Sequence, residues 1–176
     1  MTPAPLVSIV MPNLNSRQYL AERIESILAQ SYTNWELIIV DSYSDDGAWE
    51  LIQEYVANDR RFRASQAPRE GIYPGLNRCL GLARGEYIYI ATSDDTMDPD
   101  CLRHMVAALT APPECGLCHM CLRVIDEDGK TVEGMWRQFP VSKFFGQWMD
   151  VPHIRRAPYD GILHSAVYTV YTSLTQ

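Results

Sequence analysis

Short apolar runs alternate with amphipathic segments through the first part of the chain, and this alternation constrains the fold more than any other feature. Apolar runs lie at 6–11, 35–40 and 87–91, a short third strand is expected at 62–65, and a segment of helical periodicity follows each of the four. Strands and helices in regular alternation imply right-handed crossovers between parallel strands, with helices on both faces of one sheet. The sequence therefore predicts an α/β fold with a mostly parallel, Rossmann-like sheet.

The helical segments carry apolar residues three or four positions apart, as expected for helices that pack by one face. We expect Asp45 or Asp46 to cap the second helix and Gly85 to end the third, which spans 74–84. The fourth is expected to start at Asp98 and Pro99. The expected inward positions are Leu20, Ile24, Ile27, Leu28, Trp49, Ile52, Tyr55, Val56, Leu76, Leu80, Ala83, Leu102, Met105, Val106 and Leu109.

The run 87–91 has no polar alternation, which predicts an interior strand covered on both faces. Asp94 and Asp95 follow it directly. Neighbouring carboxylates repel each other and stay ionised beside water or a cation, and Mg²⁺ or Mn²⁺ is the natural cation for carboxylate oxygens. The alternative is that these acids cap the next helix, but Asp98 before Pro99 offers a better cap.

Polar residues also follow two other predicted strands. Residues 12–15 follow the first strand, and the loop 41–47 follows the second. Ligands of parallel sheets bind outside the carboxyl ends of the strands, so these loops and 92–95 should meet at one rim. Acids at two strand ends and a polar turn at a third favour a nucleotide site.

Charge and length exclude several classes of protein. The chain has 176 residues and a formal net charge of -7, with a pI near 5.0. Its scattered Lys and Arg residues form no basic face for a nucleic acid. Residues 1–12 lack the pattern of a secretory signal, and no apolar run approaches membrane-spanning length. We expect a single cytoplasmic domain without a transmembrane segment, with peripheral membrane attachment left open.

The cysteine-rich stretch CGLCHMC contains Cys115, Cys118, His119 and Cys121. It matches both a zinc-like CxxC pattern and the CxxCH pattern of haem attachment. Haem attachment needs export and a second axial ligand, and structural zinc usually takes its ligand pairs from separate turns. Packing of small core cysteines in an apolar, strand-like stretch is the favoured interpretation.

The later part of the chain has a different character. Residues 116–125 and the residues from Thr131 onward predict a hairpin or bent strand, with Asp128 and Gly129 in its turn. Residues 134–160 lose periodicity, and their scattered aromatic side chains either line an acceptor pocket or pack the loop against the body, with packing favoured. The type of 161–176 is ambiguous.

Four segments resemble, in order and spacing, the family 2 glycosyltransferases, a large inverting group with the GT-A nucleotide-diphospho-sugar-binding fold. They are VSIVMPNLN, WELIIVDSYSDDG, EGIYPGLNRCLGLARGEYI, and ATSDD followed by PDCL. The resemblance is strong over 6–109 and weak over the hairpin. It implies one GT-A-like domain in 1–176, with a nucleotide-sugar-binding half in 1–112 and the start of an incomplete acceptor-side half in 113–176.

The resemblance also implies roles by position. Asp41 is similar to the acid that hydrogen-bonds the nucleotide base, Asp46 to the second acid of that loop, and Asn77 to an Asn of the helix before the metal strand. The implied donor-binding residues are Pro12, Asn13, Asn15, Asp41, Ser44, Asp46, Asn77, Ser93 and Asp94. The implied ligands of Mn²⁺ or Mg²⁺ are Asp94 and Asp95, which match the DxD-type motif. A metal there stabilises charge on the departing nucleoside diphosphate.

The implied partners are a UDP- or GDP-linked sugar donor and a carbohydrate, lipid-linked or protein acceptor, in polysaccharide biosynthesis, with a homo-oligomer left open. The sequence departs from the family pattern at several site positions. Leu14 stands where the family often has an aromatic that stacks on the base, and Ser42 and Tyr43 replace the commoner Asp and Gly. Thr92 replaces the first acid of a full DxD motif, and 74–75 differs from the usual residues before Asn77.

Inverting transfer needs a general base for the acceptor hydroxyl, and the family carries it in its later half. Asp126, Glu127 and Asp128 are predicted hairpin-turn residues, while Asp150 and Asp160 lie in a stretch without an assigned structure, so no catalytic residue is assigned. We expect a fragment of a longer transferase. The alternative is a nucleotide-sugar-binding module without catalysis. A different Rossmann-like enzyme is disfavoured because no GxGxxG follows the first strand.

Overall fold

The computed structural model describes residues 3–111, 116–118, 120, 123–126 and 129–132. The chain divides into two compact units, Met1–Pro113 and Glu114–Gln176. The first unit holds a sheet of four parallel strands in the order β3-β2-β1-β4. Its elements are β1 (Val7–Asn13), α1 (Arg17–Leu28), β2 (Trp35–Asp41), α2 (Ala48–Asn58), β3 (Phe62–Gln66), α3 (Ile72–Leu82), β4 (Tyr87–Ile90) and α4 (Cys101–Thr110). The predicted α/β fold is confirmed.

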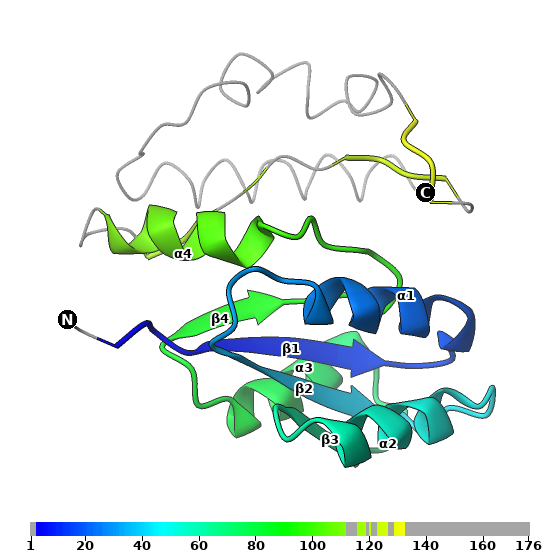
Figure 1. Ribbon diagram of the computed structural model, residues 1–176. Coiled ribbons are helices and arrows are strands. Elements are labelled where there is room, and N and C mark those ends of the chain that lie inside the picture. The colour runs from blue at the N-terminus through cyan, green and yellow to red at the C-terminus, as the bar shows by residue number, and fades with distance from the viewer. Residues whose placement is uncertain (1–2, 112–115, 119, 121–122, 127–128, 133–176) are drawn as a thin grey trace, which may run out of the picture. The chain divides into compact units, whose positions relative to one another are not determined.

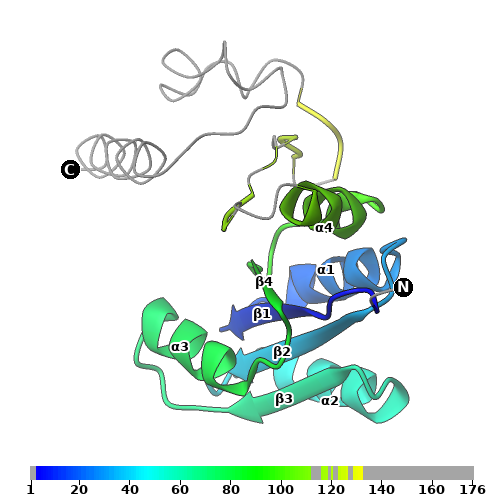
Figure 2. The ribbon, with the colours of Figure 1, turned by 90° about the vertical axis from the view of Figure 1, so that its left-hand side faces the viewer.

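Helices cover both faces of this sheet, as Figures 1 and 2 show. On one face α1, α2 and α4 pack over a core that includes Ile9 of β1 and Ile39 of β2. On the other face α3 packs over a smaller core that includes Val10 and Ile38. β1 and β2 are almost entirely buried because helices lie on both of their sides. Their mostly apolar sequences, broken within the strands by the buried polar residues Ser8 and Glu36, follow from this position.

The expected inward positions are buried or half-buried, with one exception in α3. Leu80 is exposed, because the face of α3 that meets the sheet runs through Gly75, Leu76, Cys79 and Ala83. α4 begins at Cys101 with Asp100 at its N-cap, later than the predicted start at Asp98 and Pro99. The carboxylate of Asp98 accepts a hydrogen bond from the amide of Asp100 in the turn before the helix. The N-cap of α2 is Gly47, and neither Asp45 nor Asp46 is in the cap position; the carboxylate of Asp46, one residue before the cap, accepts a hydrogen bond from the amide of Ala48 at 3.0 Å.

The prediction for the strand before the acidic pair is wrong in the described part of the chain. There β4 pairs with β1 alone and is an edge strand. Its side chains alternate: Tyr87 and Tyr89 pack against the larger core, whereas Ile88 is 42% and Ile90 62% exposed. α3 contacts β1 and β2, which leaves the outer isoleucines uncovered by it. An apolar run therefore did not distinguish an edge strand from an interior one.

A buried network at the amino edge of the sheet fixes the connection from α3 into β4. The hydroxyl of Ser8 donates to Glu36 at 2.7 Å and accepts from the amide of Gly85 at 2.7 Å. The amide of Arg84 donates to the same Glu36 carboxylate at 2.8 Å. A Cβ atom at Gly85 would lie 2.6 Å from the amide nitrogen of Ser8 and 2.7 Å from the carbonyl oxygen of Leu6. Gly85 is therefore required by a close approach of two backbones.

Two polar side chains, one in α1 and one just after its C-terminus, hold in place the segment that follows Asp94 and Asp95. The Ser26 hydroxyl accepts a hydrogen bond from the amide of Met97 at 3.1 Å. Gln30 donates to the carbonyl of Asp98 at 2.7 Å and accepts from the amide of Leu102 at 3.0 Å. Because Gln30 is buried, these bonds join the start of α4 firmly to α1.

Arg23 of α1 is a buried cation with no carboxylate partner among the described residues. Its side chain is 1% exposed, and within the described part of the chain its Nε and Nη1 atoms have no hydrogen-bond partner. The guanidinium carbon lies 6.0 Å from the centre of the Tyr89 ring. Burial raises the pKa of Tyr89, and the charge of Arg23 opposes that rise. Unpaired buried N–H groups and an uncompensated charge both oppose folding.

We expect Arg23→Met to leave the free energy of unfolding unchanged or to raise it by about 1 to 3 kcal/mol, because methionine keeps apolar volume without a buried charge. Arg23→Ala should lower it, because alanine leaves a cavity beside Tyr89. Urea denaturation of both variants and the parent at pH 7 measures the three values. A clear loss of stability in Arg23→Met would mean that the cation has an anionic partner in the folded protein.

The described residues of the second unit contain a tight turn. Ile125 and Thr131 form an antiparallel bridge, and the amide of Gly129 donates to the carbonyl of Asp126 at 3.0 Å. Gly129 has a positive φ of 76°, which a glycine adopts without strain. The hairpin turn is thus confirmed around Gly129. Cys115, His119 and Cys121, and the predictions for 134–160 and 161–176, lie outside the described residues. No helix in the part that is described is long and apolar enough to cross a membrane.

Candidate functional site

Asp41 stands at the centre of a polar network at the carboxyl edge of the sheet. It is the last residue of β2 and lies beside Asn13 of β1 and Gln66 of β3 in the strand register. Its carboxylate accepts hydrogen bonds from Asn13 Nδ2 at 2.8 Å, Gln66 Nε2 at 3.1 Å, the Ser44 amide at 3.0 Å and the Ser44 hydroxyl. The parallel topology thus gathers three strand ends around one carboxylate.

The protonation state of Asp41 follows from this environment. Burial alone raises the pKa of a carboxyl group, and Asp41 is fully buried. The hydrogen bonds from Ser44, Asn13 and Gln66 outweigh that effect and hold the pKa of Asp41 below its usual value. Asp41 is therefore ionised at neutral pH and presents a fixed negative charge at the strand ends.

The loops after β1 and β2 are tied to each other by side chains that the sequence singled out. The hydroxyl of Ser44 accepts a hydrogen bond from the amide of Asn15 at 2.9 Å. Asn15 exchanges two hydrogen bonds with Asp45, and Asp46 accepts one from the amide of Arg17 at 2.8 Å. Asp46 thereby joins the starts of α1 and α2. The rim is held in place before any ligand arrives.

Arg69 forms a clamp on the loop after β2. Its Nε donates to the carbonyl of Ser42 at 3.1 Å, and its Nη2 donates to the carbonyl of Tyr43 at 2.6 Å. The same Nη2 atom lies 2.9 Å from Asp45, with both side chains largely exposed. The Arg69 ion pair and the hydrogen bonds of Asn15 both lower the pKa of Asp45.

Asp94 and Asp95 are exposed and lie just beyond β4, at the same edge of the sheet as Asp41. The Thr92 hydroxyl donates to Asp95 at 2.6 Å, and among the described residues no ion pair joins either acid. No group of three His, Cys, Asp or Glu side chains that could hold a metal occurs in the described part of the chain. A metal here would take its remaining ligands from a diphosphate and water, as Mg²⁺ commonly does.

Several predicted site residues lie outside the Asp41 network. Asn77 is exposed on α3, and Ser93 is partly exposed in the loop after β4; among the described residues no hydrogen bond joins either of them to the network. Pro12 does pack against α3, because a Cβ atom added at Gly75 of α3 would lie 3.1 Å from the Cβ atom of Pro12. The structure therefore joins Asn13, Asn15, Asp41 and Ser44 in one network, beside which Asp46 bonds the starts of α1 and α2. Asn77, Asp94 and Asp95 are exposed and Ser93 is partly exposed.

The sequence did not point to every residue that builds this rim. Gln66, Ser16 and Arg69 were not singled out, although Ser16 donates to Asn13 and the other two contact Asp41 or its loop. Gln66 ends β3, one residue past the predicted strand end. Applying the strand-end rule to the third strand as well would have found it.

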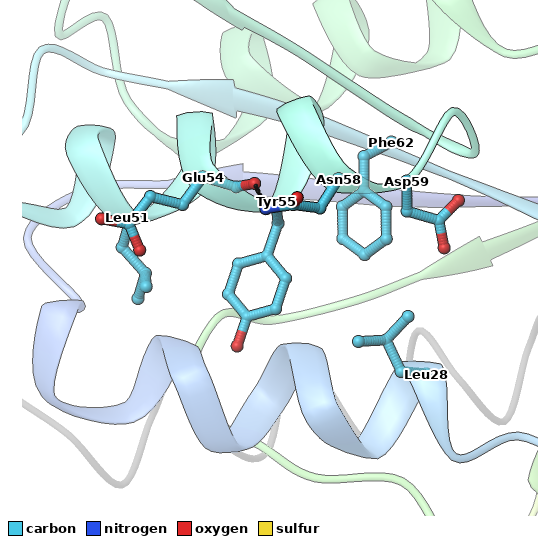
Figure 3. Close-up of a pocket in the computed structure, with 7 residues that line it drawn as sticks. All are labelled: Leu28, Leu51, Glu54, Tyr55, Asn58, Asp59 and Phe62. Carbon is cyan, nitrogen blue, oxygen red and sulfur yellow. Dashed lines mark hydrogen bonds between the residues drawn. The ribbon is translucent and has the colours of Figure 1, made fainter.

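A shallow cavity of about 390 Å³ lies elsewhere, between α1 and α2. Figure 3 shows Tyr55 pointing from α2 toward α1, with Leu28 and Phe62 beside it. The Tyr55 hydroxyl donates to Glu25 at 2.8 Å. Burial is the larger cause and this hydrogen bond the next, and together they raise the pKa of Tyr55 to about 12. The cavity shares no lining residue with the rim around Asp41 and is separate from the candidate site.

Comparison with known proteins bears on this geometry. The sequence profile described as "Glycosyl transferase family 2" matches residues 8–167. EpsE of Bacillus subtilis (strain 168), which is named as a glycosyltransferase, is 37% identical over 131 residues, covering 73% of this chain and 47% of EpsE. The chain spans less than half the length of the curated relatives it matches.

Two solved structures are similar in fold. TarS 1-349 of S. aureus in complex with UDP-GlcNAc has a TM-score of 0.55 and 25% identity, over 58% of this chain and 30% of that chain. The mannosyltransferase PcManGT of Pyrobaculum calidifontis, in complex with GDP-Man and Mn²⁺, has a TM-score of 0.58 and 26% identity, over 63% of this chain and 34% of that chain. The expected GT-A fold is confirmed, and because the family profile covers well over half of the sequence, this chain belongs to glycosyl transferase family 2.

Proposed function

We propose that this chain forms the donor-binding part of an inverting glycosyltransferase that uses a nucleotide-diphospho-sugar and a divalent metal. The observation that carries the proposal is the ionised, buried Asp41, fixed at the carboxyl edge of a family 2 sheet that also carries the exposed pair Asp94 and Asp95. The complexes of related structures with UDP-GlcNAc and with GDP-Man and Mn²⁺ support this assignment.

Each end of the proposed site has a distinct task. Asp41 accepts a hydrogen bond from an N–H group of the base, held in position by Asn13, Ser44 and Gln66. Asp94 and Asp95 hold Mn²⁺ or Mg²⁺, and their exposure leaves room for diphosphate oxygens. The metal supplies positive charge where negative charge develops on the leaving nucleoside diphosphate. Asn15 and Asp46 keep the two loops at the nucleotide end in register.

The proposal extends to the division of the chain. Residues 1–112 form the donor-binding half, and 113–176 begin the acceptor-side half. Within this division the general base and the acceptor, whether a carbohydrate, a lipid-linked sugar or a protein, belong to the acceptor side. The donor-binding half alone is enough to bind nucleotide, because both of its charged ends come from residues before 112.

Calorimetric titration of the purified chain with UDP, GDP and their sugars, with and without Mn²⁺, tests the proposal. We expect one nucleotide to bind with Mn²⁺ present and to bind much more weakly after EDTA treatment. Failure of every nucleotide to bind in the presence of the metal would contradict the proposal. Turnover of the sugar nucleotide distinguishes a transferase from a module that only binds it.

A further inference from the structure

Tyr43 has a backbone conformation that its residue type disfavours. Its φ is 51°, in the left-handed region. In this region the Cβ atom comes too close to the backbone carbonyl oxygen, so residues other than Gly, Asn and Asp are uncommon in it and bulky ones are rare. Asn15 has the same φ but is one of the tolerant types, and its side chain is bonded to Asp45. Tyr43 is therefore the strained position of the rim.

The strain is imposed from both sides of Tyr43. The preceding Asp41 and the following Ser44 are bonded to each other in the buried network. Arg69, which lies after β3, donates hydrogen bonds to the carbonyl groups of Ser42 and Tyr43. The backbone at Tyr43 is thus fixed in place, and the segment has no freedom to relax. Strain that the surroundings hold in this way concentrates at ligand sites.

The side chain of Tyr43 does not offset this strain by packing. It is 54% exposed and belongs to neither hydrophobic core of the described residues. Within that same part of the chain its ring forms no aromatic or cation–π contact, and its hydroxyl forms no hydrogen bond. Leu14, in the neighbouring loop, is 48% exposed and offers no flat ring.

We propose that Tyr43 presents its aromatic ring as the surface on which the nucleobase of the donor stacks. The inference rests on the proposed nucleotide function of the site. Three features support it: the ring is exposed, its backbone is fixed against Asp41 and Ser44, and its strain has no compensation inside the protein. An aromatic side chain stacks on any base, whereas Asp41 selects by its hydrogen bond.

Four variants separate the ring from the backbone. Tyr43→Phe keeps the ring and the strain, Tyr43→Ala keeps the strain without the ring, and Tyr43→Gly removes both. Tyr43→Asn tolerates the left-handed conformation and also lacks the ring. For each variant we would measure the dissociation constant of the preferred nucleotide with Mn²⁺ by calorimetry, and the Tm by scanning calorimetry. Inorganic diphosphate with Mn²⁺ serves as the probe without a base.

We expect Tyr43→Gly, Tyr43→Ala and Tyr43→Asn to weaken nucleotide binding about 5-fold to 100-fold, the range of base–aromatic stacking. Tyr43→Phe should bind like the parent, and diphosphate binding should be the same in all five proteins. The Tm of Tyr43→Gly should exceed that of Tyr43→Ala, because glycine relieves the strain.

Unchanged nucleotide affinity in Tyr43→Gly would overturn the inference, as would an equal loss of diphosphate affinity. A loss in Tyr43→Phe equal to that in Tyr43→Ala would also overturn it, because the hydroxyl and not the ring would then matter. These outcomes are distinct from failure of the proposed function, in which the parent protein itself binds no nucleotide with Mn²⁺.

Discussion

Replacing Asp95 with asparagine is expected to weaken Mn²⁺-dependent binding of UDP or GDP more than about 100-fold, because even partners that only orient a metal ligand are worth 10-fold to 100-fold. Asp94→Asn should have a similar effect. Both side chains are exposed beyond β4, so the Tm of each variant should stay close to that of the parent. Calorimetry with the nucleotide that the parent prefers, in the presence and absence of Mn²⁺, measures the loss.

Glu86→Gln is the matched control. Glu86 is also exposed, and its replacement by glutamine removes the same unit of negative charge. It directly precedes β4, however, and so lies at the opposite edge of the sheet. Its variant should bind nucleotide and Mn²⁺ like the parent. If Asp95→Asn and Glu86→Gln behave alike, the acidic pair is not the metal site. If both acidic variants bind as tightly as the parent, the proposed metal dependence is wrong.

Gly85→Ala is expected to lower the free energy of unfolding by about 3 kcal/mol, near the upper end of the range for overpacked sites. The new Cβ would meet the backbone of Ser8 and Leu6 at 2.6 and 2.7 Å. These atoms belong to β1 and its entry, so relief requires β4 to shift away from β1. Such a shift also breaks the hydrogen bonds that join Gly85 and Arg84 to Ser8 and Glu36.

Gly81→Ala provides a control with the same chemical change. Gly81 lies within α3, and a Cβ there would have no atom within 4 Å. Alanine is the better helix former, so this variant should gain roughly 0.5 to 1 kcal/mol. Urea unfolding curves of the two variants and the parent should therefore shift in opposite directions. Equal shifts would show that the contact at Gly85 does not limit stability.

The sequence predicted the fold well where physical signals were local and strong. The apolar runs of β1 and β2 and the periodicity around Leu20 and Ile52 are such signals. With the strand-end rule, they placed Asn13 and Asp41 at one rim, where the structure joins them by a hydrogen bond. Pattern alone was enough because these elements are buried on the faces that the pattern describes.

Other features depended on tertiary contacts that periodicity does not encode. The apolar run predicted that Ile88 and Ile90 are buried, yet β4 lies at the edge of the described sheet and only its tyrosines pack inward. Arg23 carries a charge, but its helix position directs it into the core. The clamp by Arg69 depends on a side chain that reaches back to a loop far along the sequence. Such contacts follow from the assembled sheet.

The closed hydrogen-bond network around Asp41 has a consequence for how a base is selected. An ionised carboxylate has about four acceptor positions, and the four hydrogen bonds from Asn13, Gln66 and Ser44 use them before a ligand binds. A base that donates to Asp41 therefore exchanges one partner for another and gains little net hydrogen bonding. The displaced amide or hydroxyl must in turn find an acceptor on the base, or it stays buried and unpaired at a cost of about 1 to 3 kcal/mol. Bases that complete this exchange are accepted and the others are rejected, so Asp41 contributes to the choice of nucleotide more than to the strength of binding.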